Sequence, residues 1–313
     1  MRALIVGVNG QDGSYLAELL LSKGYEIHGT VRRSSLPNLQ RIEHIRDRIT
    51  LHWADLSDSS SLHDAVRQSM PDEVYNLGAM SDVRVSFDVP EYCSNVTGLG
   101  AVRLLEAVRQ VKPDARFYQA GSSEMHGNNP DVPCNEESAF YPASPYAAAK
   151  VYAHNITRNY REAYGMFAVS GILYNHESER RGVEFVTRKI TLGLSDILTG
   201  KSDCIELGNI HAARDWGHAR DYVRAMYLMM TAPEPDDYVV ATGEAHTVVE
   251  FLTEAFDYVG LDWRGHVAIN TDLCRPSDPP LLLGDAAKAH QALGWKPEVG
   301  FSELVGLMVE ADL

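Results

Sequence analysis

Arg2-Ala3-Leu4-Ile5-Val6-Gly7-Val8-Asn9-Gly10-Gln11-Asp12-Gly13 opens the chain and decides its fold class. The short apolar run predicts a buried parallel strand, and the glycines are followed by a helix with Leu16, Leu19 and Leu20 on one face. The Gly-x-x-Gly-x-x-Gly spacing permits a tight turn and lets a pyrophosphate approach the amide-rich N-terminus of that helix. We therefore predict a dinucleotide site here, in preference to a glycine loop that only turns the chain.

Short apolar strands and helices continue to alternate after this turn. We predict further strands at 25–31, 49–53, 73–76, 116–120 and 168–173, with intervening helices such as 59–67 and 92–110. This βαβ succession requires right-handed crossovers and a parallel sheet covered on both faces. The expected fold class is α/β, a doubly wound parallel sheet of the Rossmann type with a smaller, mainly helical substrate lobe.

The pattern also suggests how the chain is divided. We expect the cofactor domain to span residues 1–172, joined by parts of 211–243, where a further strand is predicted at 238–241. Residues 173–313 would form an interleaved second lobe. Within it, Thr247-Val248-Val249-Glu250 has the pattern of a capping box, and another helix is expected to open near Asp285 and end at Gly294.

The residues after the second strand indicate the type of dinucleotide. Enzymes that prefer NAD place an acidic residue here for the ribose 2′-hydroxyl, but this chain has Arg32-Arg33-Ser34-Ser35. Two guanidinium groups suit a 2′-phosphate, so we predict NADP as the cofactor. Further along, Asp55-Leu56 is positioned to contact an adenine edge, and the small residues of Leu77-Gly78-Ala79-Met80-Ser81 can lie along the cofactor.

Two further motifs carry candidate chemistry. Tyr146 and Lys150 lie one helical turn apart, and Tyr146 could act as a general base if a nearby ammonium favoured its anion. Ser122-Ser123-Glu124 follows the strand at 116–120, at the sheet edge where ligands bind in such folds. Either motif alone is common as a surface helix or a helix cap. Together with the glycine turn they resemble the extended short-chain dehydrogenase/reductase family.

Composition restricts the possible partners and compartment. The 313 residues are 45% apolar and 23% charged with a net charge of -15, which argues against generic nucleic-acid or membrane binding. The four cysteines are scattered without Cys-x-x-Cys spacing, which favours reduced thiols over a metal site or a disulfide framework. Since the first strand begins at residue 2, we expect no signal peptide, and the predicted location is the cytoplasm.

Longer stretches resemble the GDP-mannose 4,6-dehydratases over nearly the whole chain. They include Gly10-Gln11-Asp12-Gly13-Ser14-Tyr15-Leu16, Asn175-His176-Glu177-Ser178 and Arg214-Asp215-Trp216-Gly217-His218-Ala219, besides 32–35, 41–44, 75–81, 85–87, 117–120, 185–190 and 294–297. The resemblance implies an NADP-dependent hydro-lyase that converts GDP-mannose to GDP-4-keto-6-deoxymannose. It also implies a homo-oligomer, a dimer or tetramer, because the segment after Arg33 is associated in that family with cofactor-bridging subunit contacts.

The same resemblance assigns roles to individual residues. The catalytic residues would be Ser122, in the family's threonine position, Glu124, Tyr146 and Lys150. The cofactor-binding residues would be Gly7, Asn9, Gly10, Gln11, Asp12, Gly13, Arg32, Arg33, Asp55, Leu56, Leu77, Ala79, Ser81, Tyr92, Lys150, His176 and Arg181. The substrate-binding residues would be Ser81, Ser123, Asn175, Glu177, Lys189, Arg214, Arg275 and Asp278, and no metal is expected.

The implied chemistry suits these residue types. Tyr146 would take the proton of the 4-hydroxyl as hydride leaves carbon 4, and Ser122 would hydrogen-bond that oxygen. Glu124 would then remove the acidic proton at carbon 5, water would leave across carbons 5 and 6, and hydride would return to carbon 6.

The chain departs from the family pattern at Asp82, Asn95, Met125, His126 and Ala143. These departures leave open a dehydratase of another GDP-sugar, such as a GDP-heptose. The fold also leaves open a nucleotide-sugar epimerase or oxidoreductase, and a non-catalytic binding protein of the same architecture.

Overall fold

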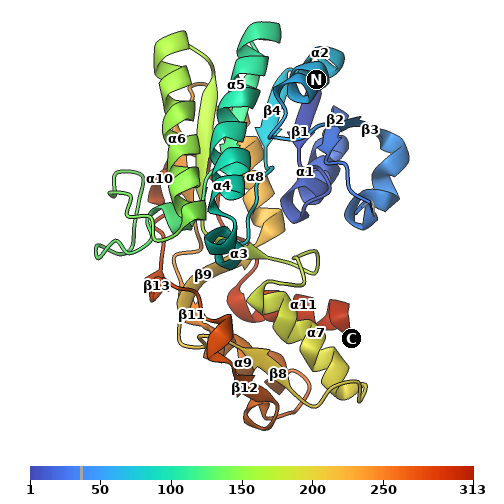
Figure 1. Cartoon of the computed structure of the whole chain (residues 1–313), viewed down its shortest axis with the longest axis vertical. Coiled ribbons are helices and arrows are strands. Elements are labelled where there is room, and N and C mark those ends of the chain that lie inside the picture. The colour runs from blue at the N-terminus through green and yellow to red at the C-terminus, as the bar shows by residue number, and fades with distance from the viewer. Residues whose placement is uncertain (36–37) are drawn as a thin grey trace.

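A seven-stranded parallel sheet forms the centre of one half of the molecule (Figure 1). The computed structural model describes residues 1–35 and 38–313. The strand order is β10-β6-β5-β4-β1-β2-β3, and every neighbouring pair is parallel. The strands are β1 (Arg2–Val6), β2 (Glu26–Val31), β3 (Ile49–Trp53), β4 (Glu73–Asn76), β5 (Arg116–Ala120), β6 (Ala168–Leu173) and β10 (Asp237–Val240). The predicted doubly wound parallel sheet is confirmed.

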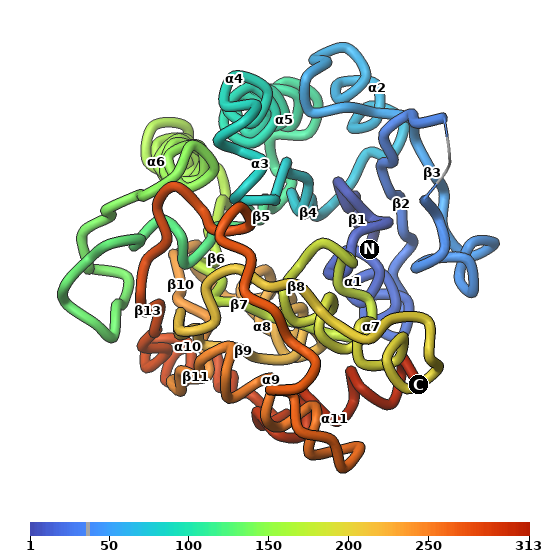
Figure 2. Tube along the Cα trace, turned by 60° about the horizontal axis from the view of Figure 1, so that its bottom comes forward, coloured from blue at the N-terminus to red at the C-terminus, as the bar shows by residue number. Residues whose placement is uncertain are grey.

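Helices cover both faces of this sheet, which explains why β4 and β6 are buried along their whole length (Figure 2). One face carries α1 (Gln11–Ser22) and α8 (Ala219–Thr231), which pack against each other. The other face carries α2 (Ser59–Ser69), α5 (Gly100–Val111) and α6 (Pro145–Tyr164).

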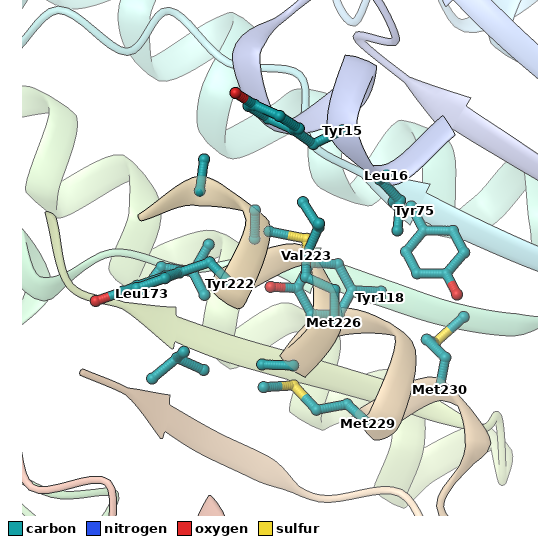
Figure 3. Close-up of a cluster of buried hydrophobic side chains, with 14 of the residues drawn as sticks. Tyr15, Leu16, Tyr75, Tyr118, Leu173, Tyr222, Val223, Met226, Met229 and Met230 are labelled. Atoms are coloured by element: carbon teal, nitrogen blue, oxygen red, sulfur yellow. The ribbon is translucent and has the colours of Figure 1, made fainter. Parts of the chain in front are cut away.

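The core under α8 is built from aromatic and methionine side chains (Figure 3). Met226, Met229 and Met230 of α8 are fully buried, in the same cluster as Tyr118 of β5. Unbranched methionine side chains fill the irregular space between a helix and bulky tyrosine rings. This packing holds α8 and β5 together and so supports the end of β5, where Ser122 and Glu124 follow.

The turn between β1 and α1 depends on glycine at two positions. Gly7 has a φ of +82°, which side-chain-bearing residues rarely adopt. A Cβ at Gly13 would lie 2.3 Å from the carbonyl oxygen of Gly7 and 2.7 Å from the Cα of Val8. The first turn of α1 therefore lies directly against the backbone that leaves β1.

The helix predicted at 92–110 is present but is divided into three consecutive segments. These are α4 (Pro90–Cys93), the π-helical segment η2 (Ser94–Leu99) and α5. A Cβ at Gly100 would lie 2.7 Å from the Cβ of Leu56, so the start of α5 lies against the loop after β3. The apolar periodicity of the sequence does not distinguish a short π-helical stretch from a regular helix.

The second half of the molecule is mainly helical and contains two small sheets. Its apolar cluster joins α7 (Val186–Leu198), α9 (Val248–Asp257) and α11 (Phe301–Asp312). One small sheet contains β7 (Asn175–Glu177), β9 (Ala213–His218), β11 (Ala245–Thr247) and β13 (Leu281–Leu282), and the other pairs β8 (Ile205–Leu207) with β12 (Val267–Ile269). The shorter helices are α3 (Val83–Asp88), α10 (Ala287–Leu293), η1 (Gln40–Arg48), η3 (Ser123–Met125), η4 (Trp263–Gly265) and η5 (Thr271–Leu273).

The chain passes between the two halves more than once. After β9 in the small sheet, α8 and β10 return to the main sheet, and the chain then enters β11 and α9. The predicted capping box is confirmed, because the Glu250 amide donates to Thr247 Oγ1 at 3.1 Å and the Thr247 amide donates to Glu250 Oε2 at 2.6 Å. Across the described part of the chain, no helix combines the length and apolar character needed to cross a membrane.

Two helical glycines should respond to alanine in opposite ways. We expect Gly13→Ala to lower the free energy of unfolding by more than about 2 kcal/mol, because the new methyl group meets backbone atoms that cannot yield. The control is Gly306→Ala in α11, where the nearest atom is Tyr258 Cε2 at 3.4 Å. That change should raise the free energy of unfolding by about 0.5–1 kcal/mol through helix propensity. Urea unfolding measures both, and equal effects would contradict the close approach at Gly13.

Candidate active site

A pocket opens at the carboxyl ends of β1, β4, β5 and β6, and we call it the strand-end pocket. Gly7, Leu77, Gly121 and Leu173 line it where or just after these strands end. The order of the sheet reverses between β1 and β4, and ligands of open α/β sheets bind at such a reversal.

Helix α6 places Tyr146 and Lys150 in this pocket. Ser144 caps the helix by accepting a 3.1 Å hydrogen bond from the Ala147 amide, and Pro145 occupies the first helical position. Tyr146 and Lys150 follow one turn apart and are both buried. The Lys150 ammonium donates to the carbonyl oxygen of Ala120 at 2.7 Å and lies 5.7 Å from the centroid of the Tyr146 ring.

Burial dominates the electrostatics of this pair. Desolvation raises the pKa of Tyr146 above its ordinary value, and a hydrogen bond with Ser122 opposes that rise. Desolvation lowers the pKa of Lys150 to about 8, against the attraction of Asp12. Tyr146 could act as a base only if a nearby ammonium favoured its anion, but burial is the largest influence on its pKa in this structure and favours the neutral phenol.

Ser122 and Glu124 lie at the end of β5, and the serine serves as a cap. Ser122 is the N-cap of η3, and its Oγ accepts a hydrogen bond from the Glu124 amide at 3.2 Å. Glu124 is buried, and its Oε1 accepts a 3.1 Å hydrogen bond from Arg275 Nη1. Its Oε2 is also buried, and no group in the described part of the chain hydrogen-bonds to it. One carboxylate oxygen is thus held by Arg275, and the other is buried without a hydrogen-bond partner among the described residues.

A buried ion pair joins the glycine turn to β7. His176 Nε2 lies 2.9 Å from Asp12 Oδ2, and the His176 ring stacks on Tyr222 with 4.4 Å between ring centroids. Burial alone would raise the pKa of Asp12, but the charge and hydrogen bond of His176 outweigh it and lower that pKa to about 2. Burial opposes charge on His176, yet Asp12 raises its pKa above the ordinary value. Each partner therefore favours the charged form of the other, and the contact fixes β7 against α1.

A second pocket, which we call the lobe pocket, adjoins the first between the two halves of the molecule. It is lined by Asn175, Glu177, Arg181, Lys189, Arg214, Arg275 and Asp278, among others. Glu177 is buried, accepts a 2.6 Å hydrogen bond from Thr187 and forms a 3.1 Å ion pair with Arg181. Arg214 is also buried, with Nη2 at 2.7 Å from Asp278 Oδ1 and Nη1 at 2.9 Å from the Pro279 carbonyl. The lobe pocket is thus lined by five basic and four acidic side chains, a slight positive excess in a chain whose net charge is -15.

The structure brings most of the predicted site residues together. The strand-end pocket is lined by Gly7, Gly10, Gln11, Asp12, Gly13, Leu77, Ala79, Ser81, Ser122, Ser123, Glu124, Tyr146, Lys150, Asn175, His176, Arg181 and Arg275. Glu177, Lys189, Arg214 and Asp278 line the lobe pocket instead.

Six predicted cofactor residues lie outside both pockets. They are Asn9, Arg32, Arg33, Asp55, Leu56 and Tyr92. Arg32 hydrogen-bonds to the Tyr92 hydroxyl, which joins the end of β2 to α4, while Arg33 is exposed. Leu56 is buried against Gly78 and Gly100, and its carbonyl oxygen accepts a 3.0 Å hydrogen bond from Arg103.

Sequence reasoning missed several residues that line these pockets. Arg84, Phe185 and Asn209 line the lobe pocket, and Arg181 stacks on the Phe185 ring at 3.7 Å from its centroid. Asn209 Nδ2 donates to Asp278 Oδ2 at 3.1 Å. The Gly208-Asn209 pair after β8 is a turn signal, but nothing in the local sequence shows that this turn reaches Asp278.

Of the five departures from the family pattern, Asp82 alone lines either pocket. It caps α3, with Oδ1 accepting a 2.9 Å hydrogen bond from the Val85 amide. Met125 and His126 are instead buried in the protein. Apart from Ser122, which takes the family's threonine position, the departures therefore lie outside the walls of the strand-end pocket.

Removal of the buried lysine charge should stabilise the fold in a pH-dependent way. The pKa of Lys150 is about 8 in the folded protein and 10.5 for an ordinary lysine. Between these two pH values the unfolded chain therefore binds more protons than the folded protein. The free energy of unfolding of wild type should therefore rise with pH between these two values. Below pH 8, Lys150 is charged in both the folded and the unfolded state, and its burial destabilises the fold by the full amount. We expect Lys150→Met to be more stable than wild type by about 2 kcal/mol at neutral pH, with the gap closing by about pH 10. Urea unfolding of the cofactor-free proteins tests this, and a gap that does not change with pH would refute it.

Known proteins resemble this chain along its whole length. A sequence profile described as GDP-mannose 4,6 dehydratase matches residues 4–308. GDP-mannose 4,6 dehydratase 1 of Arabidopsis thaliana is 55% identical, and the match covers 99% of this chain and 89% of that protein. The human GDP-mannose 4,6 dehydratase is 49% identical over 99% of this chain and 91% of its own length.

Solved structures share the fold. UDP-glucose 4-epimerase of Thermus thermophilus, solved in complex with NAD, has a TM-score of 0.87 at 27% identity, covering 99% of this chain and 98% of that chain. The family profile, the identities over the full length and the convergence of Ser122, Glu124, Tyr146 and Lys150 lead to one assignment. The chain belongs to the GDP-mannose 4,6-dehydratase family, a family of hydro-lyases within the extended short-chain dehydrogenases/reductases.

Proposed function

We propose that this protein is an NADP-dependent dehydratase that converts GDP-mannose to GDP-4-keto-6-deoxymannose. The observation that carries the proposal is the convergence of Ser122, Glu124, Tyr146 and Lys150 in the strand-end pocket, which opens beside the cation-lined lobe pocket. Relatives with about half of their residues identical to this chain carry the name GDP-mannose 4,6 dehydratase.

The residues of the strand-end pocket fit a nicotinamide dinucleotide. Gly7, Gly10 and Gly13 leave no side chain over the turn, and the N-terminus of α1 has no side-chain cap, so its amides can receive a pyrophosphate. Arg32 and Arg33 at the end of β2 would pair with a 2′-phosphate, which favours NADP over NAD. When bound, the nicotinamide supplies a hydride acceptor at carbon 4 and a hydride donor at carbon 6.

The side chains divide the proton transfers between them. Tyr146, having first lost its own proton to solvent, would accept the proton of the 4-hydroxyl, with Ser122 hydrogen-bonded to the same oxygen. Lys150, held by the Ala120 carbonyl, would place its positive charge beside Tyr146 and favour the phenolate. The carboxylate of Glu124 would remove the proton at carbon 5, so that water can be eliminated across carbons 5 and 6.

The substrate would extend from this pocket into the lobe pocket. Ser81, Ser123, Asn175 and Glu177 offer hydrogen-bonding groups to a sugar at the junction of the two pockets. Lys189, Arg214 and Arg275 offer positive charge to a diphosphate. Asp82 in the lobe pocket and Ser122 in the strand-end pocket depart from the family pattern, and for this reason a dehydratase of another GDP-sugar, such as a GDP-heptose, is the second candidate.

The remaining predictions concern organisation and stay proposals. We place the cofactor domain at residues 1–172 with parts of 211–243, and the sugar-nucleotide lobe at 173–313. We also propose a homo-oligomer, although residues 36 and 37 of the segment after Arg33 lie outside the described residues. Four free cysteines support a reducing compartment such as the cytoplasm.

The two acid–base residues should fail at different steps. Glu124→Gln keeps size and polarity but removes the proton acceptor, so elimination should slow by roughly 10²–10⁴-fold while oxidation proceeds. Tyr146→Phe should block oxidation itself. With excess GDP-mannose and NADP, reduced-nicotinamide absorbance should therefore accumulate in Glu124→Gln and not in Tyr146→Phe.

Two further measurements check this assignment. Exchange of the carbon-5 proton with solvent deuterium should be slow in Glu124→Gln, and the wild-type product should have lost the mass of one water. Normal exchange in Glu124→Gln would move the base to another residue. If wild type leaves GDP-mannose unchanged but dehydrates a GDP-heptose, the second candidate replaces the first.

Cofactor preference should depend on Arg33. We expect wild type to bind NADP more tightly than NAD, and Arg33→Asp to reduce that preference at least about tenfold, as for loss of a charged contact of about 1.5–3 kcal/mol. The exposed Arg264, which pairs with Asp262 far from the sheet, provides the matched control Arg264→Asp. Titration calorimetry with both cofactors measures the effect, and equal affinities in wild type would rule out the proposed specificity.

A further inference from the structure

Arg275 lies where three cavities meet. It lines the strand-end pocket, the lobe pocket and a third pocket formed with Gly208, Asn209 and Ile210. Among the residues that the structure describes, it is the one that all three pockets share. A single guanidinium group therefore borders both the reacting end and the anion-binding end of the proposed substrate site.

The contacts of Arg275 differ from those of the neighbouring Arg214. Arg214 is 8% exposed at its side chain and is held by Asp278 at 2.7 Å and by two backbone carbonyls. Arg275 is 30% exposed, and its contact with Asp278 is longer, at 3.5 Å. Its shorter contact is the 3.1 Å hydrogen bond to Glu124 Oε1. Arg214 is thus a fixed cation. Arg275 instead has a partly exposed side chain, and its nearest carboxylate is that of Glu124, the candidate base.

Glu124 is correspondingly dependent on Arg275. Its carboxylate is buried, and Arg275 provides the one side-chain hydrogen bond that the described residues make to it. A carboxylate engaged in a charged hydrogen bond is a poorer proton acceptor than a free one. A diphosphate in the lobe pocket carries more negative charge than one carboxylate and would compete for the same guanidinium.

We propose that Arg275 is a positioning residue that pairs with Glu124 until a nucleoside diphosphate takes over its guanidinium, so that substrate binding itself frees the base. This inference rests on the proposed function, because it takes the occupant of the lobe pocket to be a GDP-sugar. It adds a coupling between the two ends of the site: Glu124 becomes available when the diphosphate of the substrate is in place.

The coupling predicts that removal of the Glu124 charge strengthens the binding of GDP. Because GDP must break the Glu124–Arg275 pair, Glu124→Gln should tighten GDP binding by roughly fivefold or more. The gain should fall below about twofold in the Arg275→Gln background, where there is no pair to break. Plain repulsion between Glu124 and the diphosphate would instead give the same gain in both backgrounds, and that result would overturn the proposal, as would no gain in either.

The cycle is measured by titration calorimetry of GDP into the full-length chain with NADP present, using wild type, the two single variants and the double variant. Glu177→Gln is the matched control, because Glu177 is a buried carboxylate of the lobe pocket that pairs with Arg181 instead. Its effect on GDP affinity should be the same in both Arg275 backgrounds. Cooperative thermal unfolding establishes that each variant is folded.

Arg275→Lys provides a second variant, which retains the positive charge. In the Arg275→Lys background, the gain in GDP affinity from Glu124→Gln should be intermediate between the gains in wild type and in Arg275→Gln. A gain as small as in Arg275→Gln would show that charge alone does not account for the coupling, and it would overturn the proposed competition for the cation.

GMP serves as the matched ligand, since it lacks the second phosphate. Its affinity should change less than that of GDP when Glu124 becomes Gln, and an equal change would count against the competition for Arg275. The proposed function and the proposed coupling can be tested separately. If wild type does not bind GDP, the proposed function falls; if GDP binds and the gain is independent of Arg275, the proposed function stands and the coupling is wrong.

Discussion

The close approach of α1 to the turn after β1 is the constraint on which the site depends. Only hydrogen fits on the Cα of Gly13, because a methyl group would lie 2.3 Å from the carbonyl oxygen of Gly7. That approach brings the first turn of α1 to the sheet edge and carries Asp12 within 2.9 Å of His176 on β7. The same short turn therefore shapes the strand-end pocket and connects the main sheet to the first strand of the small one.

Burial is the second determinant of the site, because it shifts the pKa values of the ionisable residues there. Its effect differs from one residue to the next. It keeps Tyr146 protonated and lowers the pKa of Lys150 to about 8, because each group is favoured in its neutral form away from water. In the Asp12–His176 pair, which is equally buried, each partner favours the charged form of the other because the two side chains are in direct contact. The pocket thus combines a neutral phenol and a lysine of lowered pKa with this fixed pair beneath the glycine turn.

The carboxylates and arginines between the two pockets form a continuous series of ion pairs, which resembles a chain of alternating charges. Glu124 pairs with Arg275, Arg275 approaches Asp278, and Asp278 holds Arg214. The guanidinium at the centre of this chain has the longer contact with Asp278 and the more exposed side chain, so it is the member most easily drawn to another anion. A negative ligand in the lobe pocket can in this way influence a carboxylate in the strand-end pocket without any movement of the backbone.

The sequence by itself determined the sheet and the motifs. The apolar runs and glycine spacing predicted β1, β3, β4, β5 and β6 at their observed bounds, because local periodicity and turn chemistry are encoded within a few residues. It also identified Tyr146, Lys150, Ser122 and Glu124 as a set, through family resemblance.

Only the tertiary structure decided which groups touch: Glu124 with Arg275, 151 positions apart, and Asp12 with His176, 164 positions apart. It also decided that burial is the largest influence on the pKa of Tyr146. Desolvation and long-range pairing depend on how all the elements pack, and no local pattern of residues records them.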